Sequence, residues 1–312
     1  MNYAVIDMGT NVFGLLMAED GPEGFRFRGE YKVAARLGDG GLASGQLSEQ
    51  AFASAARAFE QILGHLQACG GTWQIVGVAT SAFREAANGE ALQAFLVERF
   101  GVPVHIVSGD QEALLIAKGI LSAHPDVSET ALLMDIGGGS NEFILVRDEK
   151  ILWKRSFPLG MARMLERFVP ADPIAPETVA AFQTYCKEQL RPLQEVIVRE
   201  QPRLLIGSSG SFETFRDLLT GTRAAVGQPD FVPAMTFETE ALRALFARLL
   251  VSRREERVQW PCMTHVRADF IVLAALFTDC VWGMMPAGTV IKQSSYSLKE
   301  GAMMYWKEKQ EA

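Results

Sequence analysis

The sequence predicts an α/β protein made of two similar units. Its 312 residues exceed the roughly 100–200 of an average domain, and a hydrophobic fraction of 48% is enough for two cores. A strand, a glycine turn and a second strand are indicated at 4–17 and again at 132–146. Asp135 occupies the place in the second copy that Asp7 has in the first. A fold of two such units usually binds its ligand between them, so we expect an interdomain cleft.

The first copy continues from its strands into helices. A polar turn leads to an alternating strand at 25–28. Ser48 can cap a helix whose apolar residues recur at helical spacing from 52 to 66. The strand expected at 75–79 ends at Thr80, where another helix begins.

The second copy repeats this order. Helical patterns at 161–168 and 177–198 follow its strands, and the strand 204–207 then ends at Ser208. The interval along the chain from Thr80 to Ser208 equals the interval from Asp7 to Asp135. We expect the cleft to be lined by four polar turns, one around each of these residues.

The composition excludes several classes of function. With 30 Lys plus Arg against 37 Asp plus Glu, the net charge of −7 argues against binding of duplex DNA or RNA. Four cysteines without a CxxC pair argue against a disulfide framework or a zinc site. The N-terminus lacks the pattern of a signal peptide, and the most apolar stretch, 270–285, contains Asp279 and is too short for a membrane span. We therefore expect a cytoplasmic protein without a membrane partner.

The two glycine turns are the candidate sites of chemistry. Each combines a carboxylate with backbone N–H groups and hydroxyls, which can surround phosphate oxygens because glycine allows a close approach. Phosphate would repel Asp7 and Asp135, so each aspartate is a candidate to hold a divalent cation through water. The alternative for each turn is a tight hairpin that needs glycine for its backbone. The turn residues are Gly9, Thr10 and Asn11 in the first copy and Gly137, Gly138, Gly139 and Ser140 in the second.

Two further charged residues adjoin these turns. Strand alternation places Glu142 on the same face as Ser140, where it could hold the metal or orient a water; the alternative is a solvated strand carboxylate. Arg84 falls in the first turn of a helix, where the dipole disfavours a cation, so a partner is required. That partner is either a bound phosphate or a salt bridge to Glu85 or Glu90.

The segment 108–113 predicts a helix start. Ser108 and Gln111 form a capping box, which puts Glu112 in the first helical turn. A carboxylate is favoured there by the dipole alone, so one interpretation of Glu112 is structural. The other is that Glu112 faces the cleft and acts as a general base on a water.

These segments resemble the exopolyphosphatase/guanosine pentaphosphate phosphohydrolase family (Ppx/GppA) over nearly the whole chain. The Ser-Gly-x-x-Glu-Ala segment at 108–113, placed before the glycine triplet at 137–139, distinguishes this family from related kinases. The matching segments are 4–11, 36–40, 79–86, 106–113, 135–142, 158–160, 207–211, 267–269 and 297–301.

The resemblance implies two ribonuclease-H-like domains of the actin, sugar-kinase and heat-shock-chaperone superfamily. We expect the first at 1–122, joined by a C-terminal helix at 297–312, and the second at 123–296. A homodimer is an open alternative to the monomer.

The resemblance also implies Mg²⁺-dependent release of terminal phosphate from inorganic polyphosphate, guanosine pentaphosphate or both, with Mn²⁺ as the alternative metal. Glu112 matches the catalytic glutamate, while Asp135 and Glu142, with Asp7 from the first turn, are the expected metal residues. The expected phosphate-binding residues are Gly9, Thr10, Asn11, Arg84, Gly137, Gly138, Gly139, Ser140, Gly207, Ser208, Ser209, Gly210 and Ser211.

Two departures from the family pattern keep other functions open. Val12-Phe13-Gly14 stands where the family often has Ser-x-Arg, and Gln111 where glutamate is common. Both changes favour the alternative of a non-catalytic sensor of guanosine tetra- or pentaphosphate. A small-molecule kinase of the same superfamily is the remaining alternative.

Overall fold

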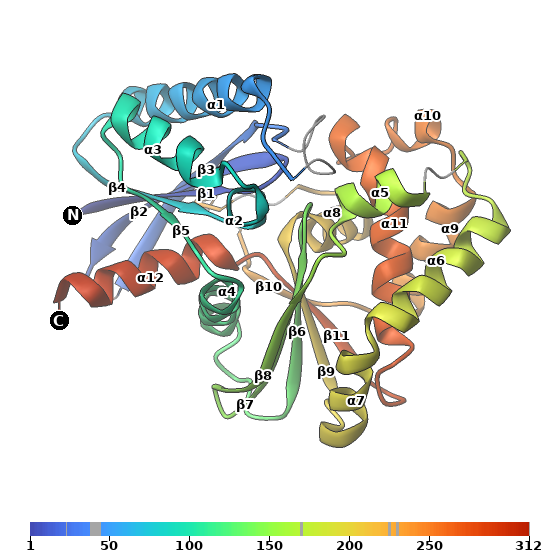
Figure 1. The fold of residues 1–312 in the computed structure, drawn as a ribbon. Helices are drawn as coiled ribbons and strands as arrows, with labels where there is room; N and C mark the ends of the chain where they lie inside the picture. Colours follow the sequence, from blue (N-terminus) through green and yellow to red (C-terminus); the bar gives the residue numbers. More distant parts are fainter. Residues whose placement is uncertain (23, 38–44, 169–170, 224–225, 229–230, 312) are drawn as a thin grey trace. The chain divides into compact units, whose positions relative to one another are not determined.

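The computed structural model describes residues 1–22, 24–37, 45–168, 171–223, 226–228 and 231–311, which form two compact units (Figure 1). Unit 1 comprises Met1–Gly119, Ala224–Phe231 and Ser297–Ala312, and unit 2 comprises Ile120–Arg223 and Val232–Tyr296.

The division expected from the sequence differs from the observed one at two places: the first boundary lies after Gly119 rather than at 122, and one later segment changes unit. It placed 224–231 in the second domain, whereas this segment belongs to unit 1. Gly227 lies so close to the third strand of unit 1 that a Cβ there would stand 2.5 Å from the carbonyl oxygen of Arg28. In the matched segment 36–40, residues 38–40 lie outside the described part of the chain.

Unit 1 is built on a mixed sheet with strand order β3-β2-β1-β4-β5. The hairpins β1–β2 and β2–β3 are antiparallel, and β4 and β5 continue the sheet parallel to β1. β1 is buried on both faces, because Ala4 and Ile6 face the core under the first helix while Val5 points to the opposite face. The strands are β1 (Asn2–Met8), β2 (Val12–Gly21), β3 (Gly24–Ala34), β4 (Trp73–Ala79) and β5 (Val104–Ile106).

Helices cover both faces of this sheet, with α1 and α3 on one face and α12 on the other (Figure 1). The predicted cap of α1 is confirmed, since the Ser48 hydroxyl accepts from the Ala51 N–H at 3.2 Å. The helices of unit 1 are α1 (Glu49–Ala68), α2 (Ser81–Glu85), α3 (Gly89–Phe100), α4 (Gly109–Ala123, whose last turn belongs to unit 2) and α12 (Leu298–Glu311).

α4 and α12 touch backbone to backbone. A Cβ at Gly119 would stand 1.9 Å from the carbonyl oxygen of Ser297, and one at Gly301 would stand 1.8 Å from that of Leu115. Only glycine can occupy both positions, because real Cβ atoms do not approach within 3.0 Å. This contact fixes the C-terminal helix against the helix that carries Glu112.

Unit 2 repeats the topology of unit 1. Its strands β8-β7-β6-β9-β11 follow the same order and directions as β3-β2-β1-β4-β5, and β10 adds an antiparallel edge. The β2–β3 register shifts after Met17 and the β7–β8 register after Leu145, at the same interval that separates Asp7 from Asp135. The strands are β6 (Ala131–Ile136), β7 (Asn141–Arg147), β8 (Lys150–Phe157), β9 (Leu204–Ser208), β10 (Ala234–Thr236) and β11 (Val290–Ser294).

One helix expected in unit 2 is two. The pattern 177–198 predicts continuous helix, but α6 ends at Gln189 and α7 begins at Arg191. Pro192 in the first turn of α7 explains the break, since proline has no N–H to continue the hydrogen-bond ladder. None of the described helices has the length and apolar character needed to cross a membrane. The helices are α5 (Met161–Phe168), α6 (Pro176–Gln189), α7 (Arg191–Glu200), α8 (Ser209–Thr220), α9 (Thr239–Val251), α10 (Arg254–Arg257) and α11 (His265–Trp282).

The backbone contact between α4 and α12 gives a first prediction. Gly301→Ala should lower the free energy of unfolding by about 2–3 kcal/mol, because the added methyl overpacks a backbone contact. Gly64→Ala in α1 is the matched control, since nothing lies within 4 Å of its Cβ position and helix propensity favours alanine by about 0.5–1 kcal/mol. Urea unfolding of both variants tests this. Equal stabilities would refute the close contact.

Glu300 in the same helix is buried with only part of its carboxylate bonded. Oε2 accepts from the Ser297 N–H at 2.8 Å, while Oε1 has no partner among the described residues. Burial raises the pKa of Glu300 from 4.5 to about 7, against the opposing charge of Lys299. The folded state therefore holds this proton more tightly than the unfolded chain does.

The sign of this shift gives a second prediction. Because the folded state binds this proton more tightly, Glu300 makes its full contribution to the free energy of unfolding below pH 4.5. That contribution is lost as the pH rises through about 7. Glu300→Gln has no carboxyl group at this position, so its free energy of unfolding should not fall with pH in this way. The difference amounts to up to about 3 kcal/mol, at about 1.4 kcal/mol per pKa unit. Chemical denaturation at pH 4.5, 6 and 8 measures it, with the exposed Glu308→Gln as control. Parallel pH profiles for Glu300→Gln and the unmodified protein would contradict the prediction.

Candidate active site

The start of α4 positions Glu112 in unit 1. The predicted capping box is confirmed in both directions: the Gln111 N–H donates to Ser108 Oγ at 3.2 Å, and the Ser108 N–H donates to Gln111 Oε1 at 3.0 Å. Glu112 therefore begins the helix at a defined position, and only 6% of it is exposed. A carboxylate buried this deeply requires charged or hydrogen-bonding partners.

Arg84 is that partner. Its Nη1 donates to Glu112 Oε2 at 2.7 Å and to the Val107 carbonyl at 3.0 Å. The ion pair that the sequence analysis allowed for Arg84 was with Glu85 or Glu90; the structure pairs it with Glu112 instead. Nη2 and Nε make no hydrogen bond to any described residue, so this guanidinium retains donors for an anion.

An open pocket of about 730 Å³ lies beside this ion pair. Arg84 and Ser108 contribute positive and polar lining, and Glu90 and Gln93 of α3 also line the pocket. All of these residues belong to unit 1. The pocket gives a charged ligand physical access to the guanidinium.

The first glycine turn is fixed by neighbouring segments of unit 1. Thr10 Oγ1 lies 3.2 Å from Ser81 Oγ, which links the turn to the first residue of α2. The Asn11 carbonyl accepts from the N–H groups of Ala35 and Arg36 at 2.9 and 3.0 Å. Gly9 precedes Thr10 and Asn11 in this turn, and Asp7 lies half-buried near the end of β1.

Asp135 is the centre of the hydroxyl cluster in unit 2. Its register partners are Glu142 in β7 and Ser208 in β9, so all three lie in one row across the sheet. Ser208 Oγ donates to Oδ2 at 2.6 Å, and Ser209 Oγ lies 2.8 and 2.7 Å from Oδ1 and Oδ2. Ser209 has a left-handed backbone, φ 67°, a costly conformation for a non-glycine residue that functional sites often contain.

Glu142 is deeply buried. Only 2% of it is exposed, and its Oε1 accepts from Ser140 Oγ and Ser156 Oγ, both at 2.7 Å. The prediction that Glu142 shares a face with Ser140 is confirmed, and the alternative of a solvated carboxylate is wrong. The reason is that β8 pairs with β7 and places Ser156 directly opposite Glu142.

The second glycine turn presents N–H groups that the described chain does not use. Its carbonyls are occupied: Gly137, Gly138 and Gly139 accept from the backbone of Met161, Ala162 and Gly160 at 2.9, 2.9 and 3.3 Å. The N–H groups of Gly138 and Gly139, by contrast, donate to no described residue. Since unpaired backbone donors inside a protein are rare and costly, this turn is suited to bind an anion.

The segment 207–211 lies against Arg267, a residue of the matching segment 267–269 to which the sequence analysis gave no role. Gly210 at the start of α8 lies against the Arg267 side chain, so that a Cβ there would stand 1.6 Å from Nη2. Burial lowers the pKa of Arg267, and Glu213 opposes this. No described residue makes a hydrogen bond or an ion pair with this guanidinium. Ser211 is buried beside Gly210 in sequence, and Gly207 packs on the Phe212 ring.

A usable signal for Arg267 was present in the sequence. Arg267 is a cation in the first turn of α11, where the dipole disfavours positive charge, which is the argument that the sequence analysis made for Arg84. The same argument applied to both arginines would have identified both.

The donor set fits Mg²⁺ held jointly with a ligand rather than by the protein alone. No group of three acidic, histidine or cysteine side chains that could hold a metal occurs in the described part of the chain. Asp135 and Glu142 are neighbours across β6 and β7, and Mg²⁺ is commonly bound by one or two carboxylates together with water and phosphate oxygens. The expected metal role of Asp7, Asp135 and Glu142 stays a prediction.

Comparison with known proteins extends over the whole chain. A model of the Ppx/GppA phosphatase family matches residues 18–310. An exopolyphosphatase from Cytophaga hutchinsonii ATCC 33406 is 30% identical, with a TM-score of 0.91 over 99% of this chain and 98% of that one. The Ppx/GppA family member of Aquifex aeolicus, 20% identical, shares the fold with a TM-score of 0.79 over 100% and 99% of the two chains.

The fold class predicted from the sequence is confirmed by these likenesses and by the repeated strand order. The chain is α/β, with two ribonuclease-H-like units. The cleft expected between them stays a prediction.

The hydroxyl cluster around Asp135 gives a third prediction. Ser208→Ala should lower the free energy of unfolding by about 1.5–3 kcal/mol, because a buried carboxylate loses a charge-assisted hydrogen bond. Ser128→Ala, on an exposed loop of the same unit, should change it by less than about 0.5 kcal/mol. Thermal and urea unfolding compare the two. A loss no larger for Ser208→Ala than for Ser128→Ala would show that the bond contributes nothing.

Proposed function

The chain belongs to the Ppx/GppA phosphatase family, and on that premise we propose that it hydrolyses inorganic polyphosphate from the chain end. The whole-length likeness to an exopolyphosphatase supports the choice of substrate. The single observation that carries the mechanism is the ion pair between the buried Glu112 and Arg84.

Glu112 is the proposed general base. Its carboxylate takes a proton from a water molecule as that water attacks the terminal phosphorus. The bond from this phosphorus to the bridging oxygen breaks, and the shortened polyphosphate leaves with the electron pair. Arg84 holds Oε2 of Glu112 through Nη1, and its remaining N–H groups contact a phosphoryl oxygen.

Residues of unit 2 bind the negative charge in this proposal. The N–H groups of Gly138 and Gly139 surround phosphate oxygens, and Arg267 beside Gly210 contributes a positive charge. Fixed donors of this kind lower the barrier by positioning the phosphoryl group and by stabilising charge that develops on it. The serines of 208–211 orient the carboxylate of Asp135 and the start of α8.

We propose Mg²⁺ as the cofactor, with Asp135 and Glu142 as its residues in unit 2 and Asp7 in unit 1. The ion would neutralise phosphate oxygens and so reduce repulsion of the attacking water. Because these carboxylates would share the ion with substrate oxygens, metal affinity should rise when a polyphosphate is present.

A guanosine tetra- or pentaphosphate ligand is the second candidate. Gln111 and Val12-Phe13-Gly14 depart from the family pattern and favour a sensor that binds without turnover. Hydrolysis of guanosine pentaphosphate would instead make it a further substrate.

A fourth prediction tests the hydrolase. Phosphate release from long polyphosphate, tripolyphosphate and guanosine pentaphosphate is measured with and without Mg²⁺. Glu112→Gln should reduce release by about 10²–10⁴-fold, the usual contribution of a general base, and keep the thermal unfolding midpoint. Glu90→Gln is the matched control, because this exposed carboxylate lines the pocket beside Arg84 without bonding to it in the described structure.

The outcomes separate the candidates. Release lost in Glu112→Gln and kept in Glu90→Gln supports the base. If both variants release phosphate at the same rate, Glu112 is not the general base and another group takes the proton. Absence of release from all three compounds, with tight binding of guanosine pentaphosphate, supports the sensor. ADP formed from ATP only when a sugar or carboxylate is added supports a kinase.

A further inference from the structure

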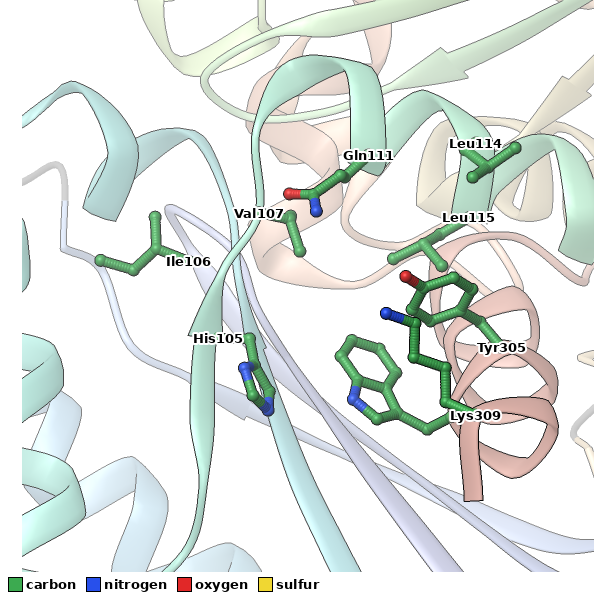
Figure 2. A pocket seen from close by; sticks show the side chains of 9 residues that line it. His105, Ile106, Val107, Gln111, Leu114, Leu115, Tyr305 and Lys309 are labelled. Carbon is green, nitrogen blue, oxygen red and sulfur yellow. The ribbon is translucent and has the colours of Figure 1, made fainter. Parts of the chain in front are cut away.

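A second pocket of about 290 Å³ lies within unit 1, between the β5–α4 segment and α12 (Figure 2). Its floor is apolar and buried, formed by Val107 and Leu115. Leu114 stands at its rim with 43% of its surface exposed, so the apolar lining continues to the pocket mouth. This volume lies just below the ~300–1,000 Å³ that is usual for small-molecule sites, so only a small ligand fits.

Aromatic rings form the wall on the side of α12. The rings of His105 and Trp306 lie 5.4 Å apart between centroids at an angle of 30°, and Tyr305 meets Trp306 edge-on at 5.5 Å. Trp306 is therefore held in place by two neighbouring rings while remaining partly exposed. A wall of this kind binds a flat ring by stacking.

Two polar groups stand at the rim. Gln111 Oε1 is occupied by the Ser108 N–H of the capping box, so the amide offers its NH₂ group to a ligand. Lys309 lies over the Tyr305 ring, with its nitrogen 5.2 Å from the centroid, and makes no ion pair within the described residues. Figure 2 shows both on the pocket lining with His105 and Tyr305. The site thus combines a stacking surface, a hydrogen-bond donor and one uncompensated positive charge.

We propose that this pocket binds a mononucleotide. The base stacks on Trp306, a base carbonyl or ring nitrogen accepts from the Gln111 amide, and the phosphate pairs with Lys309. The small volume and the single cation favour one phosphate group over a longer chain. This separates the pocket chemically from the polyphosphate site, where the arginines and the glycine turns provide many donors.

This pocket and the proposed catalytic residue Glu112 are formed by the same segment of the chain. His105, Ile106 and Val107 line both this pocket and the pocket beside Arg84, and Gln111 immediately precedes Glu112. A ligand bonded to Gln111 therefore acts on the cap that positions Glu112. This consequence rests on the proposed function, whereas the binding itself does not.

Calorimetry with AMP and GMP provides a fifth prediction, independent of hydrolysis, because a mononucleotide has no phosphoanhydride bond. At least one of the two should bind the unmodified protein. Trp306→Leu should raise the Kd at least tenfold through loss of stacking, and Lys309→Ala by about three- to tenfold. Trp306→Phe keeps an aromatic ring and should keep most of the affinity. Lys118→Ala is the charge control, since Lys118 on α4 pairs with Glu308 and does not line the pocket.

Several results would overturn the proposal. One is the absence of binding at millimolar AMP and GMP in protein with an unchanged unfolding midpoint. Another is a Kd that Trp306→Leu and Lys309→Ala both leave unchanged, which would place the nucleotide elsewhere. Inorganic phosphate binding as tightly as AMP would indicate a simple anion site at Lys309. If binding holds while polyphosphate is not hydrolysed, this inference stands and the proposed function fails.

Discussion

Two helices from distant parts of a sequence can touch backbone to backbone only where neither carries a Cβ. α4 and α12 meet in this way, at Gly119 and Gly301, and both the candidate base Glu112 and the pocket ring Trp306 lie on the helices that this contact joins. α12 also packs on β1 and β2 of the sheet. The contact between α12 and α4 therefore determines where α4 lies relative to that sheet. The Ser108 cap then determines where Glu112 enters the interior, and Trp306 becomes one wall of a pocket whose opposite wall is α4.

The two units share a topology but differ in register, and this difference accounts for the hydroxyls around Asp135. Asp135 pairs with Ser208, whereas Asp7 pairs with Val78, which precedes the helix cap Thr80. The equal intervals along the chain therefore relate Thr80 to Ser208 in sequence but not in their places across the sheet. α8 begins closer to its carboxylate than α2 does, so serine hydroxyls reach Asp135 directly.

Local features could be predicted from the sequence, because neighbouring residues determine them: the Ser48 cap, the Ser108–Gln111 box and the duplicated hairpins. Features that depend on distant residues could not. Arg84 and Glu112 come from separate helices, and no periodicity in either segment encodes their pairing. The burial of Glu142 depends on Ser156 across a strand pair, and the position of Arg267 depends on Gly210. The resemblance supplied the roles proposed for these residues, whereas their hydrogen-bond and ion-pair partners come from the folded chain.

Gln111 joins the two sites of unit 1, and its chemistry indicates why an amide is present there. The cap needs only an acceptor for the Ser108 N–H, which a glutamate would provide equally well. A glutamate would also add one negative charge, next to Glu112 in the sequence and on the lining of the pocket that Lys309 shares. The amide keeps the cap, removes that charge and adds a donor toward the pocket. Glutamine therefore gives up the favourable interaction of a carboxylate with the helix dipole, and in return it leaves the pocket without a negative charge that would repel the phosphate of the proposed ligand.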